Sequence, residues 1–160
     1  MAWLQKLATL GIELPPVAAP AAKYVPAVRT GSLVYTAGQL PMVDGKLAAT
    51  GKVGGGDAGG SGGAEISPDD AKRYARLCAL NGLAAVHALV GIDTVTRVVK
   101  VVGFVASAPG FTGQPAVING ASELLGEVFG DAGAHARSAV GVAELPLGAP
   151  VEVELIVEVA

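Results

Sequence analysis

Charged and aromatic residues are scarce in this chain, and it has one cysteine. Charged side chains make up 16% of the 160 residues and aromatic side chains 4%. The lone Cys78 excludes a framework of intrachain disulfides. The 11 lysines and arginines are scattered and the net charge is −3, so the basic footprint of a nucleic-acid-binding protein is missing. We therefore expect no nucleic-acid partner.

Residues that usually carry metal or nucleophilic chemistry are also sparse. The two histidines, His87 and His135, have no cluster of acids or thiols around them in the sequence, so we expect no metal site. No Gly-x-Ser-x-Gly motif occurs, and no Ser-His-Asp set can be assembled with any specificity. Cys78 falls on the apolar side of a predicted helix, which predicts a buried and inert thiol.

No apolar run is long enough to span a bilayer. The longest candidate, residues 77–92, is broken by Asn81, Gly82 and His87. Residues 1–7 lack the charged region, apolar core and cleavage site of a leader, so we expect a cytoplasmic protein without a membrane partner. Hydrophobic residues still make up 51% of the chain, and the mean hydropathy is +0.53. We expect this surplus apolar surface to be buried between subunits.

The first third of the chain predicts a short helix, an extended arm and a few strands. Residues 3–10 have helical apolar spacing, and residues 15–20 contain three prolines that favour an extended arm. Strands are predicted at residues 24–28 and 33–38, with a third near residues 47–50. We therefore divide the chain into residues 1–22, a helix with a proline-rich arm, and residues 23–160, a single domain.

A glycine-rich segment, residues 51–63, follows these strands. It contains a Gly-x-Gly-x-x-Gly match at residues 54–59, but the next predicted helix starts about eight residues later. A dinucleotide fingerprint needs its last glycine to open the helix directly. A flexible loop is therefore the preferred interpretation of this segment.

The second half predicts two helices and three strands. Ser67, Pro68 and Asp70 mark a helix start that resembles a capping box, and Gly91 marks its end. A β-branched strand follows at residues 94–105, and a second helix at residues 115–129. The last quarter predicts two strands joined by a turn, at residues 136–146 and 151–159, lying next to each other. In the final strand, alternate residues form one apolar face: Val151, Val153, Leu155, Val157 and Val159.

This order of elements predicts an α+β protein with a mixed sheet of five to six strands. Two helices can cover only one face of such a sheet, so the other face must meet solvent or another chain. The early strands carry apolar and small residues on both sides. A partly apolar uncovered face favours an oligomer whose sheets pack around a shared axis.

Four segments, in order, resemble the Rid proteins (reactive intermediate deaminases, also called YjgF-like or endoribonuclease L-PSP). They are YTAGQLP at residues 35–41, VVKVVGFV at 98–105, ARSAVGVAELP at 136–146 and VEVE at 151–154. The resemblance covers roughly residues 24–159, and the extra helix and glycine-rich loop resemble a longer subgroup. It implies a chorismate-mutase-like fold and a homotrimer with active sites between subunits. It also implies hydrolysis of 2-iminobutanoate- or 2-iminopropanoate-type imines to 2-oxo acids and ammonia, without metal or organic cofactor.

The resemblance assigns catalytic roles to Arg137 and Glu152. A guanidinium can pair a carboxylate with two parallel hydrogen bonds, and the family uses this arginine to hold the substrate carboxylate. The family's first glutamate of VEVE lies near the substrate and positions water, and a partly buried carboxylate can move protons there. The alternatives are a surface or ion-paired arginine and a solvated strand glutamate.

Further binding residues follow from the same motifs. Tyr24 would line the cleft, Asn119 would face the site from its helix, and Gly38 would allow close approach of the backbone. The alternatives are a core or interface aromatic for Tyr24 and a solvent-facing asparagine for Asn119. The chain departs from the family at Ala37, where the family has serine, and at Ala139, where it has cysteine. Losing a hydroxyl and a thiol removes two polar contacts to the ligand.

These departures leave a second function class open. The chain could be a trimeric binding or regulatory module that keeps the anion pocket for small carboxylates but not the catalysis. A ribonuclease, as the older family label implies, is disfavoured by the acidic balance and the scattered bases.

Overall fold

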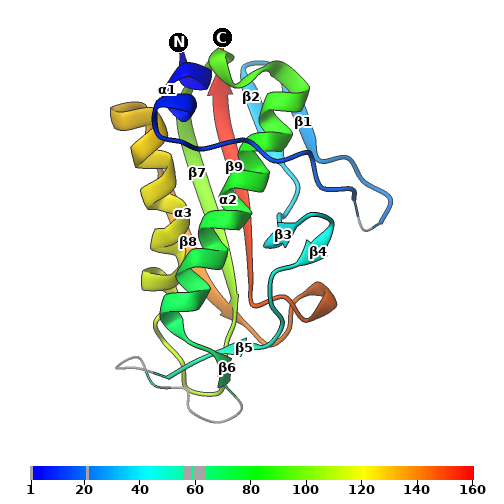
Figure 1. Ribbon diagram of the computed structural model, residues 1–160, viewed down its shortest axis with the longest axis vertical. Helices are drawn as coiled ribbons and strands as arrows, with labels where there is room; N and C mark the ends of the chain where they lie inside the picture. The colour runs from blue at the N-terminus through cyan, green and yellow to red at the C-terminus, as the bar shows by residue number, and fades with distance from the viewer. Residues whose placement is uncertain (1, 21, 56–58, 60–63) are drawn as a thin grey trace.

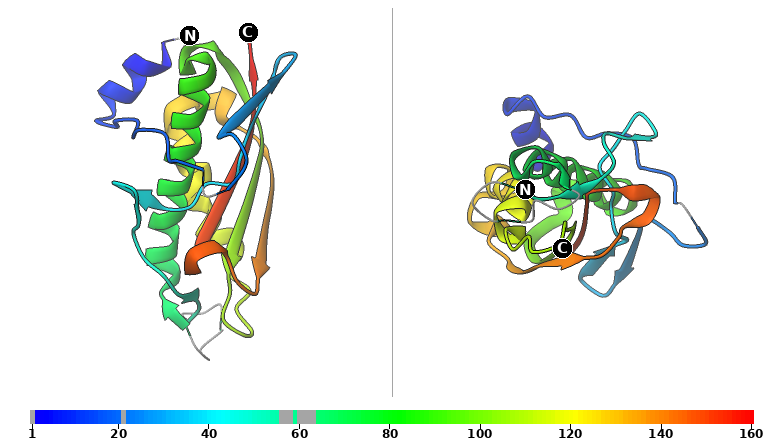
Figure 2. Two further views of the ribbon diagram at one scale, coloured as in Figure 1. Left: turned by 90° about the vertical axis from the view of Figure 1, so that its right-hand side faces the viewer. Right: turned by 90° about the horizontal axis from the view of Figure 1, so that it is seen from below.

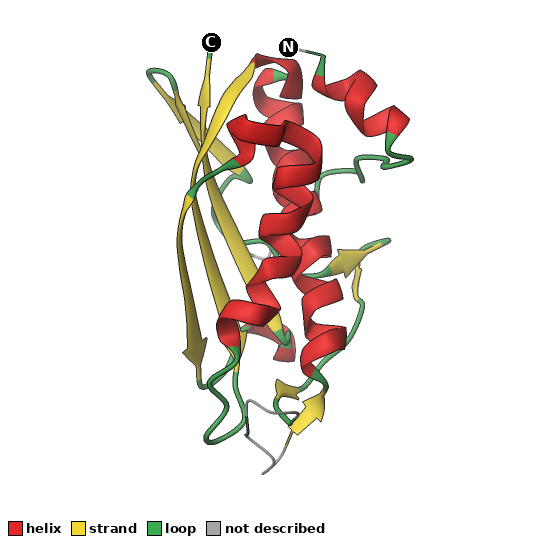
Figure 3. Cartoon of the chain, turned by 90° about the vertical axis from the view of Figure 1, so that its left-hand side faces the viewer, coloured by secondary structure: helices red, strands yellow, loops and turns green. Residues whose placement is uncertain are grey.

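The computed structural model describes residues 2–20, 22–55, 59 and 64–160. Five strands form one mixed sheet, and two long helices lie side by side on one of its faces (Figures 1 and 3). This arrangement confirms the predicted α+β fold. The strands are β1 (Ala27–Thr30), β2 (Leu33–Thr36), β7 (Val95–Ala106), β8 (Ala136–Val142) and β9 (Val151–Val159), and the helices are α2 (Pro68–Val90) and α3 (Gln114–Phe129).

The strand order is β1-β2-β9-β7-β8, with β7 and β8 parallel and the other pairs antiparallel. The prediction that the last two strands are neighbours is therefore wrong, because β7 lies between them. Helix α3 carries the chain from β7 to β8 as a crossover, which makes those two strands parallel. Residues 143–150, with the 3-10 turn η4 (Pro146–Gly148), then return the chain to the far side of β7.

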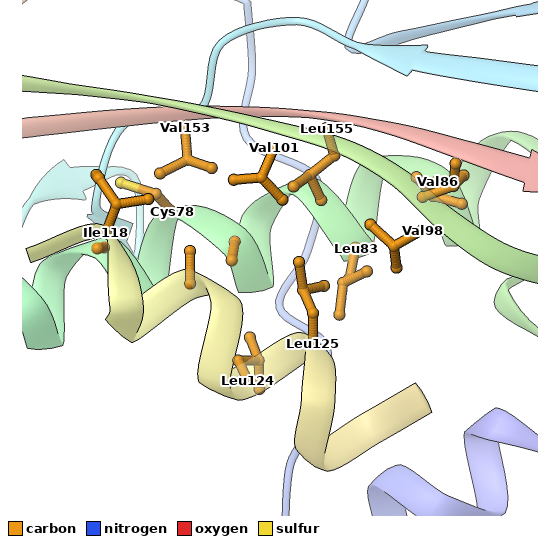
Figure 4. Close-up of a cluster of buried hydrophobic side chains, with 14 of the residues drawn as sticks. Cys78, Leu83, Val86, Val98, Val101, Ile118, Leu124, Leu125, Val153 and Leu155 are labelled. Atoms are coloured by element: carbon orange, nitrogen blue, oxygen red, sulfur yellow. The ribbon is translucent and has the colours of Figure 1, made fainter. Parts of the chain in front are cut away.

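The core fills the space between the sheet and the two helices (Figure 4). Alternate residues of β9 point into it, as predicted, and each is almost fully buried. Glycines set two close approaches: a methyl group at Gly103 would overlap Ile118, and one at Gly120 would overlap the backbone carbonyl of Lys72. The second contact lets α3 lie directly against α2.

Helix α2 begins and ends where its sequence predicts. The Ser67 hydroxyl accepts a hydrogen bond from the Asp70 backbone N–H at 3.1 Å, and Pro68 occupies the first turn. Gly91 ends the helix with φ of 79°, and its N–H donates to the carbonyl of His87. Asn81, buried in the middle of the helix, donates to the carbonyls of Leu40 and Met42 and so holds the segment after β2.

The N-terminal helix α1 (Trp3–Thr9) packs on the same core. It confirms the helix predicted at residues 3–10. The Trp3 indole donates to the carbonyl of Val95 at 2.8 Å, and its ring meets Phe129 edge-on at 5.0 Å. The proline-rich arm then crosses α2 on the way to β1 (Figure 1).

The early strands differ from their prediction. β1 begins at Ala27 rather than residue 24, because Pro26 has no N–H to donate to the ladder. Instead of a strand at residues 47–50, a small hairpin joins β3 (Met42–Val43) to β4 (Lys46–Leu47). The turn residues Asp44 and Gly45 both have positive φ, at 51° and 79°. Asp-Gly is a strong signal for such a turn, and the prediction overlooked it.

Part of the segment predicted as a glycine-rich loop is ordered into a strand. Strand β5 (Lys52–Val53) pairs in parallel with β6 (Ala64–Ile66), and both were missed because each has at most three residues. Residues 56–58 and 60–63, which include part of the Gly-x-Gly-x-x-Gly match, lie outside the described residues. No helix in the described portion is long and apolar enough to cross a membrane.

No helix of the described residues lies over the second face of the sheet (Figure 2). Its exposed side chains include three large apolar ones, Val28 at 52%, Tyr35 at 43% and Val140 at 45% of their full accessible area. Glutamates of β9 alternate with the buried valines and point to the same open face. The uncovered, partly apolar face predicted from the sequence is therefore present.

Candidate functional site

Arg137 lies on the edge strand β8, and its side chain reaches toward α3. Nη1 donates to Asn119 Oδ1 at 2.8 Å and to Ser122 Oγ at 3.2 Å, and Nη2 donates to the carbonyl of Pro115 at 3.2 Å. The first turns of α3 therefore hold the guanidinium in one orientation. The alternative of a structural ion pair finds no support, since none of these three partners carries a charge.

These contacts leave part of the guanidinium available. A guanidinium has five N–H donors, and three of those of Arg137 are taken by Asn119, Ser122 and Pro115. The others, Nε–H and one N–H of Nη2, have no acceptor among the residues that the structure describes. They belong to adjacent nitrogens, which form one edge of the planar fork that can pair with a carboxylate.

Ala139 lies two residues beyond Arg137 on the same face of β8. It is opposite Gly103 of β7 and packs on the edge of the core. Neither residue has a side chain beyond a methyl group, and Ile118 of α3 packs directly over Gly103. Arg137, Asn119 and Ala139, predicted from three separate motif positions, thus form one cluster, called here the arginine cluster.

Glu152 lies near the start of β9 and points to the open face. Its neighbours Val151 and Val153 point into the core, which fixes the opposite direction for the carboxylate. The carboxylate lies over Gly38, where even a methyl group would overlap Glu152 Oε1. Gly38 therefore has a specific reason to be glycine: it makes room for this acid.

The environment of Glu152 changes its acidity. Partial burial raises the pKa of its carboxyl above the usual range, and the nearby Glu154 raises the pKa further. A carboxyl with a raised pKa exchanges protons closer to neutral pH, which suits a group that both accepts and donates a proton.

Tyr24 and Gly38 line one small cavity at the end of β2. Its other walls come from the proline-rich arm and the segment around the small hairpin, and the lining residues are Ala18, Ala19, Pro20, Pro26, Gln39, Leu40, Met42 and Leu147. The lining is mostly apolar. Tyr24, Gly38 and Glu152 therefore form a second group, called here the glutamate cluster, next to an apolar recess. That the proline-rich arm would form part of its wall was not predicted from the sequence.

Within one chain, the two clusters are apart. Arg137 is paired with Val101 and points to the helix-covered side, whereas Glu152 is paired with Phe104 and points to the open side. Strand β7 separates their strands (Figure 1). The six predicted site residues are thus brought into two half-sites on opposite faces of the sheet, and one chain does not join them.

Sequence reasoning missed Ser122, which accepts a hydrogen bond from Arg137. The signal was available, because Ser122 stands three residues after Asn119 and positions three apart lie on the same face of a helix. The other residues considered for chemistry have structural contacts. The His87 ring accepts from the Ile92 N–H, and Cys78 is fully buried, where burial raises the pKa of its thiol. No group of three or more potential metal ligands occurs among the described residues.

A mixed sheet with two helices on one face makes this an α+β protein, with an arginine at one sheet edge and an acid on the bare face. A family model described as endoribonuclease L-PSP matches residues 16–159. The chain therefore belongs to the endoribonuclease L-PSP family, the Rid or YjgF-like proteins, as its motifs predicted.

Relatives support this assignment over nearly the whole chain. Protein TCP17 of Trypanosoma cruzi is 46% identical over 154 residues, which cover 95% of this chain and 91% of that protein. The crystal structure of Atu1372 from Agrobacterium tumefaciens is 46% identical, with a TM-score of 0.85 and coverage of 99% of this chain and 92% of that one. E. coli TdcF, crystallised with bound serine, shares the fold at 23% identity, with a TM-score of 0.63 and coverage of 90% and 94%.

Proposed function

We propose that this protein hydrolyses small 2-imino acids, formed from the corresponding enamines, to 2-oxo acids and ammonia. The observation that carries the proposal is the guanidinium of Arg137. It is held by three neutral acceptors on α3 and keeps two N–H groups on adjacent nitrogens. Such an edge matches a substrate carboxylate. The serine bound to the related fold of TdcF is also a small carboxylate.

The proposed reaction needs a held substrate, a positioned water and a group that moves protons. Arg137 holds the carboxylate and so fixes the neighbouring imine carbon. Water adds to that carbon, and Glu152 accepts its proton. The same carboxyl delivers this proton to the imine nitrogen, which gives a neutral carbinolamine. Glu152 then accepts the proton of the carbinolamine hydroxyl and passes it to the nitrogen, so that the C–N bond breaks, ammonia leaves and the C=O of the 2-oxo acid forms. The raised pKa of Glu152 supports both halves of this exchange. No step requires a metal or organic cofactor.

The two half-sites must come from different chains for this reaction to occur. Arg137 and Glu152 point to opposite faces of the sheet in one chain. The bare face of the sheet carries large apolar side chains that a second copy would cover. We therefore place the active site between subunits of a homotrimer, with the arginine cluster from one chain and the glutamate cluster from its neighbour.

The test is a coupled assay in which an amino-acid dehydratase produces the enamine in situ. The wild-type protein is expected to accelerate release of the 2-oxo acid above the spontaneous rate. Arg137→Ala is expected to lower this acceleration by about a hundredfold or more, because the substrate loses its only strong anchor. The matched control is Arg73→Ala, an exposed arginine that pairs with Asp70 on α2. An unchanged rate in Arg137→Ala would contradict the assignment.

A second candidate is a binding or regulatory module for small carboxylates. It is favoured by Ala37 and Ala139, which replace the family's serine and cysteine and so remove two polar groups from the site. This candidate predicts that 2-oxo acids raise the melting temperature while no imine is turned over. Cleavage of RNA that survives Arg137→Ala and is not weakened by salt would instead favour a ribonuclease.

A further inference from the structure

A chain of hydrogen bonds extends from Arg137 to His135. His135 precedes β8, and its ring contacts two groups. Nδ1 lies 2.6 Å from the carbonyl oxygen of Gly133, and Nε2 lies 2.9 Å from Ser122 Oγ. Ser122 Oγ is also the atom that accepts from Arg137 Nη1 at 3.2 Å. The histidine thus reaches the guanidinium through one hydroxyl group.

The direction of each bond follows from the chemistry of the groups. A carbonyl oxygen only accepts, so the proton of the neutral ring must be on Nδ1. Nε2 is then an acceptor, and the Ser122 hydroxyl donates to it. A lone pair of Ser122 Oγ then remains to accept the hydrogen bond from Arg137 Nη1, because an arginine N–H can only donate. The sequence Arg137 to Ser122 to His135 to Gly133 is therefore a chain of donors, each satisfied by the next.

The far end of this chain is anchored to rigid structure. Gly133 lies in the 3-10 turn η3 (Gly130–Gly133), which follows α3 directly. A methyl group at Gly133 would overlap the backbone carbonyl of Leu125, so only glycine permits the turn to lie this close to the helix. The carbonyl that accepts from His135 is therefore fixed relative to α3, which also carries Ser122 and Asn119.

We infer that Ser122 and His135 are positioning residues for Arg137, an inference that rests on the proposed function of the arginine. His135 orients the Ser122 hydroxyl, and the hydroxyl, together with Asn119, occupies both N–H groups of Nη1. Because Pro115 accepts one N–H of Nη2, the Nε–H and the second N–H of Nη2 are the donors left for the substrate carboxylate. Neither Ser122 nor His135 needs to touch the substrate.

Two pairs of variants test the inference by calorimetric titration with 2-oxobutanoate. Ser122→Ala and His135→Leu remove a member of the chain and are expected to weaken binding about three- to tenfold, the equivalent of one net hydrogen bond. Ser122→Thr keeps the hydroxyl and His135→Gln keeps an acceptor, so both are expected to bind within about twofold of the wild type. In the imine assay the first pair should raise KM with little change in kcat. Wild-type affinity in Ser122→Ala and His135→Leu would overturn the inference.

Nitrogen-15 NMR provides a readout that does not depend on turnover or ligand. The His135 ring is expected to be protonated at Nδ1, with an Nε2 resonance that shifts in Ser122→Ala. The Arg137 guanidinium is expected to rotate faster in Ser122→Ala than in the wild type. If no 2-oxo acid binds the wild-type protein, the proposed function fails and these spectra alone decide the inference. A proton on Nε2 of a neutral ring, or unchanged guanidinium rotation, would contradict it.

Discussion

Arg137 and Glu152 differ from the ion-paired residues of the helices in what surrounds them. Lys72, Arg73 and Arg76 form ion pairs on the exposed sides of the helices, which contribute little in water. Arg137 instead has neutral partners and keeps donors for an anion. The motif singled out both residues, and the contacts show that α3 holds the Arg137 guanidinium in place.

The raised pKa of Glu152 predicts a pH dependence of stability. The Glu152 carboxyl binds its proton more tightly in the folded state than in the unfolded state. The contribution of this carboxyl to stability is therefore greatest at pH values below its unfolded pKa, and it is lost as the pH rises through its folded pKa. Glu152→Gln removes this titration. Thermal unfolding should therefore show the variant gaining stability relative to the wild type between pH 4 and pH 8. A difference that stays constant over this range would contradict the burial of this carboxyl.

At the scale of elements, local signals predicted the long segments and failed for the short ones. The cap at Ser67 predicted the start of α2, and the alternation from residue 151 to 159 predicted the bounds of β9. Strands β5 and β6 are too short to show a period. The order of strands could not be predicted either. The central place in the sheet goes to a strand whose inner face can be buried along its whole length. Strand β9 meets that condition and β8, with several exposed residues, does not.

Two glycines of α3 allow a matched test of how the helices pack. Gly120→Ala places a methyl group against the Lys72 carbonyl of α2 and is expected to lower the free energy of unfolding by about 1–3 kcal/mol. Gly126→Ala meets nothing within 4 Å, so it should raise stability by about 0.5–1 kcal/mol through helix propensity. Denaturant unfolding measures both. Equal effects of the two substitutions would show that the close approach of α2 and α3 is wrong.

At the scale of the whole molecule, the fold of one chain separates the residues of the proposed site. The sequence motifs identified Tyr24, Gly38, Asn119, Arg137 and Glu152, but a single chain sorts them into two clusters on opposite faces of the sheet. No pattern along the sequence could reveal this separation, because it arises from the position of β7 between β8 and β9. The proposed site, assembled from two copies, would bring these residues together and would cover the apolar open face.

Mixing two inactive variants tests this account most directly. A subunit with Arg137→Ala keeps an intact Glu152, and a subunit with Glu152→Gln keeps an intact Arg137. When the two are co-expressed in equal amounts, about one quarter of the clefts between subunits should receive both intact residues, as expected for random assembly. The mixed oligomer should then recover about one quarter of the wild-type deamination rate. A mixture no more active than the two variants measured separately would contradict an active site shared between chains.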